Sequence, residues 1–409
     1  MLTKAVDFYA PEVLEDPYPL YARLRVETPV FFDPEWDLTF FARHRDVVGI
    51  LKDRRFGRDV RHALGPDEVD REVYERIYPS RYPTWTRYIR DSFIDLEPPR
   101  HTRIRRLVQW AFTRRASESY RPRMETTAER AIRVAVERGH MEAVAEYATP
   151  IPLTMIAELL GIPPADQPQL LAWSHAIVRL FDREVTDEEG RAAERATIEF
   201  VEYVRELLAE RRRRPGDDLV SAMIAAEHEG DVLSEDELVS TCILTLNAGH
   251  EATVHAITNG LLALARHPDA YRWLREDPEG RAASAADELL RFDAPLQMFE
   301  RWVLEDLDWD GVALRRGTKV GLLFGSANHD EAVFGRPEEL NLARNPNPYV
   351  SFGAGIHYCV GAPLAKVELE VAYRTFARYV TSFHAEPDPA DRVKSLVFRG
   401  LRRLPLVFD

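Results

Sequence analysis

The residue best suited to carry chemistry in this 409-residue chain is Cys359, one of only two cysteines. It lies in the glycine-rich segment 351–362, directly before a helical pattern over residues 363–379. The N–H groups and the dipole at a helix N-terminus favour a thiolate over a thiol, and Gly355 and Gly361 let the backbone approach a flat cofactor closely. This placement predicts metal binding or reactivity, and the alternative is a small buried thiol in a turn.

Four residues of this loop have a specific spacing, F-x-x-G-x-x-x-C-x-G, formed by Phe352, Gly355, Cys359 and Gly361. The pattern resembles the haem loop of the cytochrome P450 family. The resemblance covers nearly the whole chain and implies a haem-thiolate enzyme with haem b, Cys359 as proximal iron ligand and O2 as co-substrate. The implied fold is mainly α with a smaller β region, and the haem lies between a long central distal helix and the cysteine-loop helix.

A second resemblance concerns an acidic and a basic residue one helical turn apart. Glu288 and Arg291 resemble the E-x-x-R of the family, and their spacing places them on one helical face, where they can form an ion pair. In the family this pair joins a downstream cation in a structural network below the haem. The third partner predicted here is Arg344.

The resemblance also assigns residues to the two haem propionates, which call for cationic or donor side chains. His101 and Arg105 match the H-x-x-x-R of the family, and Arg301 and His357 match its other propionate-binding positions. The full set of predicted cofactor-binding residues is His101, Arg105, Ala248, Arg301, Phe352, Gly355, His357 and Gly361.

Residues 248–253, Ala-Gly-His-Glu-Ala-Thr, resemble the oxygen-activation motif A-G-x-[D/E]-T with one departure. Ala252 stands where the family usually has Thr, and Thr253 lies about 100° further round the helix, so it does not simply replace the hydroxyl. The predicted catalytic positions are Glu251, Ala252 and Thr253, with Glu251 as proton-relay candidate. We hypothesise that a substrate hydroxyl or an ordered water replaces the missing hydroxyl. His250 is rejected as an iron ligand, because a ligand there would block oxygen.

The substrate-contact regions of the family map onto the aromatic-rich residues 59–94 and onto residues 170–181, 244–248, 296–299 and 396–398, most of which are apolar. The predicted pocket residues are Leu244, Ala248, Leu296, Met298, Phe299, Val397 and Phe398. Residues 59–94 have no clear period and are rich in aromatic side chains, which predicts a long loop that forms a lid or a pocket wall. The pocket is expected to accept a largely hydrophobic molecule, although core packing is the alternative for each single residue.

The elements that must position these residues are mostly helical. Apolar residues recur every three or four positions over residues 17–26, 45–52, 104–112, 124–138, 151–160, 192–212 and 282–292. The longest helix is expected to start at Ser234, with Glu237 completing a capping box, and to run to about His267. Short strand patterns lie around residues 30–41, 302–320 and 396–407.

Composition excludes some classes of protein. A net charge of −14 argues against general nucleic-acid binding, which depends on neutralising phosphates. No long apolar run and no leader pattern occurs, so a cytoplasmic location without a membrane anchor is expected. No repeat or linker interrupts the sequence, which predicts one cytochrome P450-like haem domain over residues 1–409.

The predicted reaction is insertion of one oxygen atom from O2 into a small hydrophobic substrate by hydroxylation, dealkylation or epoxidation. No flavin or nicotinamide fingerprint occurs, so no fused reductase is expected. By analogy with bacterial relatives, electrons come from a ferredoxin and its NAD(P)H-dependent reductase. Two alternatives stay open: a peroxide-driven peroxygenase of the same chemistry and a non-catalytic haem sensor. A cysteine hydrolase is weaker, because the sequence suggests no base beside Cys359.

Overall fold

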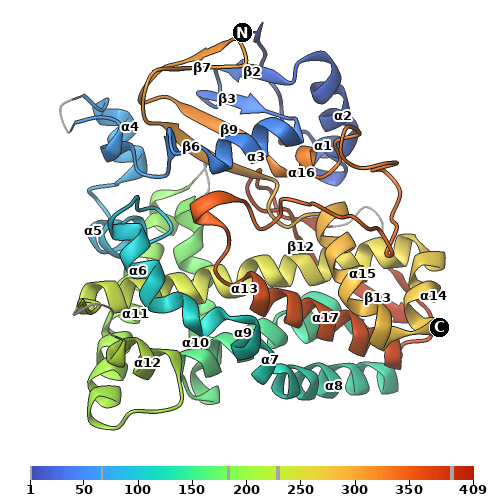
Figure 1. Ribbon diagram of the computed structural model, residues 1–409. Coiled ribbons are helices and arrows are strands. Elements are labelled where there is room, and N and C mark those ends of the chain that lie inside the picture. The colour runs from blue at the N-terminus through green and yellow to red at the C-terminus, as the bar shows by residue number, and fades with distance from the viewer. Residues whose placement is uncertain (1, 66–67, 182–184, 227–230, 387–390) are drawn as a thin grey trace. The chain divides into compact units, whose positions relative to one another are not determined.

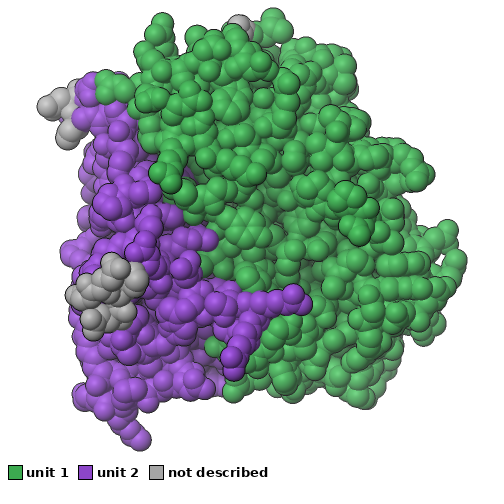
Figure 2. All heavy atoms as spheres, viewed as in Figure 1, with its two compact units in different colours: residues 1–57, 117–151, 252–409 green, residues 58–116, 152–251 purple. Residues whose placement is uncertain are grey.

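The computed structural model describes residues 2–65, 68–181, 185–226, 231–386 and 391–409, which are mainly helical with a smaller sheet region (Figure 1). The chain divides into two compact units, which Figure 2 shows in different colours. Unit 1 contains residues 1–57, 117–151 and 252–409, and unit 2 contains residues 58–116 and 152–251. The single-domain assignment made from the sequence stays a prediction.

The main sheet belongs to unit 1 and has the strand order β1-β2-β3-β9-β6-β4. Its strands are β1 (Leu2–Thr3), β2 (Val30–Asp33), β3 (Leu38–Phe41), β4 (Phe56–Gly57), β6 (Met298–Val303) and β9 (Lys319–Leu323). All four residues of β3 are buried, because alternate side chains enter two different apolar clusters. Phe40 packs with Phe31 and Met298, whereas Phe41 packs with Val320.

Shorter strands complete unit 1. A three-stranded antiparallel sheet contains β5 (His140–Glu142), β10 (Phe383–Ala385) and β13 (Pro405–Phe408). Two-stranded pairs are formed by β7 (Leu307–Trp309) with β8 (Val312–Leu314), and by β11 (Asp391–Arg392) with β12 (Leu401–Arg403). Strands therefore occur in all three regions where the sequence predicts them.

The helices of unit 1 are α1 (Pro11–Glu15), α2 (Tyr18–Glu27), α3 (His44–Lys52), α8 (Arg121–Arg138), α14 (Pro268–Glu276), α15 (Pro278–Phe292), α16 (Phe324–Ala327) and α17 (Ala362–Tyr379), with η4 (Val144–Ala148) and η7 (Gly355–His357). Helix α17 follows the cysteine loop directly and packs against α15 and α8. Most of its residues are buried, so this helix fixes the position of the loop that precedes it.

Unit 2 is helical. It contains η1 (Val60–His62), α4 (Arg71–Ile77), α5 (Pro83–Trp85), η2 (Thr86–Arg90), α6 (Arg100–Val108), η3 (Gln109–Phe112), η5 (Pro164–Asp166), α10 (Gln167–Val178), η6 (Arg179–Phe181), α11 (Asp187–Arg213) and α12 (Leu219–Ala225). Helices α7 (Arg114–Ser119), α9 (Pro150–Leu160) and α13 (Glu235–Arg266) contribute residues to both units.

The prediction of a long loop over residues 59–94 is wrong. Residues 66 and 67 lie outside the described residues, but most of the rest forms η1, α4, α5 and η2. Tyr82, Trp85 and Tyr88 are buried, and the Trp85 indole donates a hydrogen bond to the carbonyl of Ile177 at 3.1 Å. Helices this short span too few residues to show a 3.6-residue period in the sequence.

Helix α13 begins as predicted. The Ser234 N–H donates to the Glu237 carboxylate at 2.9 Å, and the Glu237 N–H donates to the Ser234 hydroxyl at 3.3 Å, which is a capping box. The helix contains 32 residues, or about 48 Å at 1.5 Å per residue. Most of its side chains from Leu238 onward are buried, so the few accessible ones in its middle stand out, and Leu244, Ala248 and Ala252 among them form a stripe.

Candidate functional site

The cysteine loop is held in place by contacts within unit 1. The Cys359 N–H donates to the carbonyl of Phe352 at 3.0 Å, and the side chain of Cys359 is exposed. At the start of the loop, the Asn328 side chain donates to the hydroxyl of Ser351 at 2.9 Å and accepts from the N–H of Val350 at 2.8 Å. The loop therefore presents an exposed thiol from a backbone that is hydrogen-bonded on both sides.

Two glycines shape the surroundings of this thiol. A Cβ at Gly361 would lie 4.0 Å from Cys359 Sγ, with no other heavy atom closer, so the backbone leaves this side of the sulfur open. Gly355 has a φ of +72°, and a Cβ there would lie 2.1 Å from the carbonyl oxygen of Leu51. Gly355 is therefore needed for the packing of the loop against the end of α3, whatever cofactor contact it also makes.

The predicted acidic and basic network does assemble in unit 1. Arg291 donates to both carboxylate oxygens of Glu288 at 2.8 Å, and Arg344 Nε lies 3.1 Å from each of the same oxygens. Asn341 and Asn347 add donors at 3.0 and 3.2 Å. The side chains of Glu288 and Arg291 are completely buried. A carboxylate with this many donors locks α15 to the segment that precedes the cysteine loop.

The residues assigned to the propionates divide between the units. In unit 1, Arg301 on β6 is buried with its guanidinium over the ring of Phe299 at 5.3 Å, and His357 is half-buried in η7 beside the thiol loop. In unit 2, His101 is buried and Arg105 half-buried on one face of α6. An exposed thiol with one open side, together with a buried arginine of the same unit, fits a flat anionic cofactor that carries a metal ion.

Thr253 is engaged by a residue that the sequence does not single out. It is buried, and its hydroxyl forms a hydrogen bond with Glu368 of α17. The two helices are in close contact here, since Tyr373 donates to the carbonyl of Ala256 at 2.6 Å. Complete burial raises the pKa of Glu368 to about 8, and the bond to Thr253 lowers it only in part. Thr253 therefore serves the α13–α17 contact and does not extend the accessible face of α13.

This buried carboxyl predicts a pH dependence of stability. Because its folded-state pKa lies above the unfolded value of about 4.3, the folded protein loses stability as the pH rises from about 4 to 8. The loss is up to about 1.4 kcal/mol for each pH unit. Glu368→Gln should remove this part of the dependence in urea unfolding measured from pH 5 to 9. Glu137→Gln, at an exposed position of α8, should retain it. Parallel curves for wild type and Glu368→Gln would contradict the prediction.

In unit 2, the Glu251 carboxylate lies close to the rings of two histidines, His175 and His250. Its Oε1 is 3.5 Å from His175 Nε2 and 4.0 Å from His250 Nδ1, and it has no hydrogen-bond partner among the described residues. Burial raises the pKa of Glu251 to about 7 and lowers that of His175. A carboxyl with this pKa exchanges its proton readily near neutral pH, which suits a relay.

The accessible side chains along the middle of α13 share one face. Ala248 is exposed, whereas Leu244 and Ala252, four residues before and after it, are half-buried in a helix that is otherwise mostly buried. In unit 1, residues 295–297 run beside residues 397–399, with a β-bridge between Leu296 and Phe398. Phe299 and Val397 are half-buried as well. Phe299 and Val397 also pack against the apolar clusters around Phe41 and Phe40, so the assignment of these positions to a substrate pocket stays a prediction.

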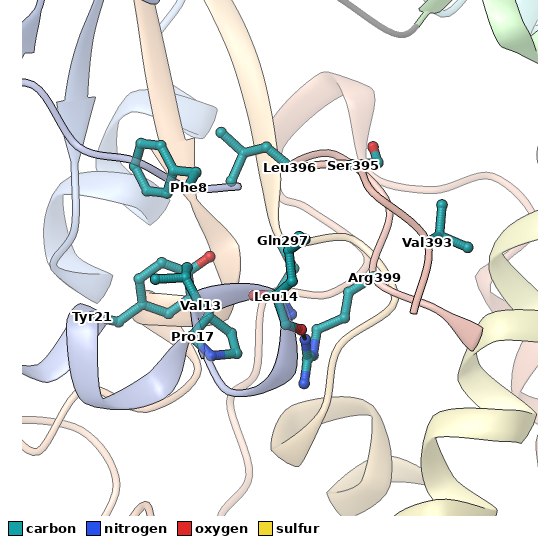
Figure 3. A pocket seen from close by; sticks show the side chains of 10 residues that line it. All are labelled: Phe8, Val13, Leu14, Pro17, Tyr21, Gln297, Val393, Ser395, Leu396 and Arg399. Atoms are coloured by element: carbon teal, nitrogen blue, oxygen red, sulfur yellow. Dashed lines mark hydrogen bonds between the residues drawn. The ribbon is translucent and has the colours of Figure 1, made fainter. Parts of the chain in front are cut away.

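Met298 is placed differently. It is 1% exposed and packs with Phe8 and Tyr21 in the core of unit 1. A small pocket in the same unit is lined by residues that include Tyr21, Gln297, Leu396 and Arg399 (Figure 3). Its described lining contains none of the predicted pocket residues named above, although Gln297 and Leu396 fall within the predicted substrate-contact regions 296–299 and 396–398. Gln297 and Leu396 line it, whereas the neighbouring Leu296 and Val397 do not, because successive side chains of extended segments point to opposite sides.

Comparison with known proteins identifies the family of this chain. The family model described as Cytochrome P450 matches residues 69–280 and 283–403. The chain belongs to the cytochrome P450 family. It is 34% identical to cytochrome P450 CYP107DY1 of Priestia megaterium over 98% of both chains. It is 35% identical to vitamin D(3) 25-hydroxylase of Pseudonocardia autotrophica over 99% of this chain and 96% of the relative.

A solved structure shares the fold throughout. P450BioI in complex with an acyl carrier protein ligated to hexadec-9Z-enoic acid superposes with a TM-score of 0.89, at 31% identity over 97% of this chain and 99% of that chain. This cytochrome P450 is accordingly an oxidoreductase of the monooxygenase type, with haem b as cofactor and O2 as co-substrate. Among the described residues, no helix combines the length and apolarity needed to cross a membrane.

Proposed function

We propose that this cytochrome P450 inserts oxygen into a small, largely hydrophobic substrate and delivers protons without a threonine hydroxyl at position 252. Cys359 would hold the iron, and His101, Arg105, Arg301 and His357 would hold the propionates. When bound, the haem supplies the activation of O2 with two electrons. One oxygen atom enters the substrate and the other leaves as water, so two protons must also be delivered.

The observation that carries this proposal is the division of roles between two neighbouring residues of α13. Ala252 is half-buried on the accessible stripe with Ala248, whereas Thr253 is buried and bonded to Glu368. Thr253 would have to break this contact to supply a hydroxyl to the stripe. Glu251, with a pKa of about 7, is the remaining acid of the motif. A substrate hydroxyl or an ordered water therefore completes the relay from Glu251.

We infer the class of substrate from the chemistry of the accessible residues, and the redox partners by analogy with bacterial members of the family. Leu244, Ala248 and Phe299 offer apolar surface, which favours a hydrophobic molecule. Related structures contain myristic acid, corticosterone or testosterone, so fatty acids and steroids are the first compounds to screen by the spin-state change that substrate binding causes. The electron donor is a ferredoxin, reduced by an NAD(P)H-dependent ferredoxin reductase.

The test is Ala252→Thr, assayed with ferredoxin, reductase and the substrate that gives the largest spin-state change. The added methyl and hydroxyl groups should displace the substrate hydroxyl or water, so product formed per NAD(P)H consumed should fall several-fold. Ala192→Thr, a half-buried control on α11, should leave this ratio unchanged. Equal ratios for Ala252→Thr and wild type would show that proton delivery does not depend on the small residue at position 252.

A peroxide-driven reaction is the second candidate, because Ala252 weakens the usual route of proton delivery. Hydrogen peroxide brings both oxygen atoms, both electrons and both protons, so a peroxide-driven reaction would need neither ferredoxin nor O2. The same substrate should be turned over faster with ferredoxin, reductase and NAD(P)H than with peroxide alone. The opposite order of rates would favour the peroxygenase.

A further inference from the structure

The cluster around Glu251 contains more donor atoms than a proton relay needs. His175 of α10 contributes a ring nitrogen, and His250 and Glu251 of α13 contribute a ring nitrogen and a carboxylate oxygen. These three atoms all lie within 4.8 Å of one another. All three residues belong to unit 2, and His175 lies 75 positions before His250 in the sequence. Two imidazoles and one carboxylate that converge in this way form a typical set of transition-metal ligands.

We propose that His175, His250 and Glu251 form a binding site for a divalent transition-metal ion of the zinc class. Zn²⁺ bonds of about 2.0–2.1 Å to nitrogen and oxygen place tetrahedral donors roughly 3.3 Å apart. The observed 3.5 Å from His175 to Glu251 is close to this spacing, and the 4.0 Å from His250 to Glu251 needs a small rotation. Three protein ligands leave the fourth position for water.

The burial of the three residues suits capture of an ion from solvent. The side chain of His175 is 59% exposed and can swing, whereas those of Glu251 and His250 are 14% and 1% exposed and are held in place. Helix α13 is packed tightly at this point, since a Cβ at Gly249 would lie 2.4 Å from Ile156. His250 Nδ1 lies 3.5 Å from the Ser174 hydroxyl, which is the outer limit of a hydrogen bond.

The donor set determines which ions should bind. Imidazole nitrogens suit Zn²⁺, Cu²⁺ and Ni²⁺, whereas Mg²⁺ and Ca²⁺ prefer sites made of oxygen ligands. Glu251 Oε1 lacks a hydrogen-bond partner among the described residues, so a cation would satisfy a buried acceptor that the protein leaves open. The site is thus expected to reject Mg²⁺ at concentrations that saturate it with Zn²⁺.

An ion bound here would have a consequence for turnover, and this step rests on the proposed function. Coordination would hold Glu251 as a carboxylate with one oxygen on the metal, which prevents it from accepting and releasing a proton. Zn²⁺ is therefore expected to lower the rate of product formation without removing the haem. The metal would act as an inhibitor of the relay and not as a cofactor of the reaction.

The experiment measures Zn²⁺ binding to the haem-loaded protein by isothermal titration calorimetry, with Mg²⁺ as the second ion. Wild type should bind one Zn²⁺ per chain at this site. Because changes in the outer shell of metal sites already cost ~10–100-fold in affinity, loss of a ligand in His175→Ala should weaken binding at least ~10-fold. His140→Ala removes an exposed histidine of unit 1 outside this cluster and should bind Zn²⁺ as wild type does.

Equal Zn²⁺ affinity in wild type and His175→Ala, or Mg²⁺ binding as tight as Zn²⁺ binding, would overturn the metal site. The carbon-monoxide spectrum of each variant verifies that the haem site is intact. Product formation is then measured with and without Zn²⁺, and His175→Ala should resist inhibition that wild type and His140→Ala show. Zn²⁺ binding at this site without inhibition would support the metal site and contradict the relay role of Glu251, so the two proposals fail separately.

Discussion

In the reduced, carbon-monoxide-bound state, the Cys359→His variant is expected to lose the absorption signature of a thiolate ligand together with all measurable turnover. The thiol is exposed in the loop just before α17, and this loop matches the haem loop of the family in all four defining positions. Histidine can still bind iron, but as a neutral ligand it does not donate the electron density that favours cleavage of the O–O bond. The measurement is the difference spectrum on adding carbon monoxide to the reduced protein.

Cys242 provides the matched control, because it is the other cysteine of the chain. It is 1% exposed within α13, and burial raises the pKa of its thiol to about 12, so it stays protonated at neutral pH. Cys242→Ala should therefore keep the thiolate signature and turnover. If Cys359→His kept the signature, or Cys242→Ala lost it, the assignment of the iron ligand would be wrong.

Arg291→Ala should have the largest effect on stability, a loss of about 3–5 kcal/mol in the free energy of unfolding. Arg291 is completely buried, as is its partner Glu288, and the guanidinium also donates to the carbonyls of Asn328 and Pro337 at 3.0 and 2.9 Å. Removing the guanidinium leaves buried carbonyl acceptors without donors. It also leaves the buried negative charge of Glu288 with fewer hydrogen-bond donors. The measurement is urea unfolding, followed by circular dichroism and by release of haem.

The control for this prediction is Arg272→Ala on α14. Arg272 pairs with Asp269 at 2.9 Å with the same three-residue spacing, but its side chain is 69% exposed and that of Asp269 is 92% exposed. Solvent screens such a pair, so its loss should cost less than about 1 kcal/mol. Similar losses in the two variants would mean that the buried network does not stabilise this protein more than a surface ion pair does.

Much of the fold can be predicted from the sequence where an apolar period is long or where capping residues identify the end of an element. The start of α13 is predicted to the residue because Ser234 and Glu237 are the two halves of a local motif. Residues 59–94 are misread as a loop because their helices are short and gain their stability from tertiary burial of residues such as Trp85. The failure therefore lies in elements that local sequence does not define.

The candidate site divides in the same way. Cys359 and the pair of Glu288 and Arg291 are found from fixed spacings, but no spacing reveals that Glu368 is buried against Thr253. A glutamate on an amphipathic helix usually lies on the solvated face. The approach of His175 to Glu251 is equally hidden, because it depends on the packing of two helices far apart in sequence. The apolar pocket residues are only partly separable from core residues, as Met298 illustrates.

The hydrogen bonds of the cysteine loop have a thermodynamic consequence for cofactor capture. The backbone of this loop is held by contacts with other parts of the protein. Asn328 bonds to Ser351, the Cys359 N–H bonds to the carbonyl of Phe352, and Gly355 lies against Leu51. The conformational entropy of ordering the loop, roughly 1–2 kcal/mol for each residue, is therefore lost when the chain folds and not when haem binds. More of the free energy of forming the iron–sulfur bond then appears as affinity for haem, because Cys359 is already held in the position it needs to bind the iron.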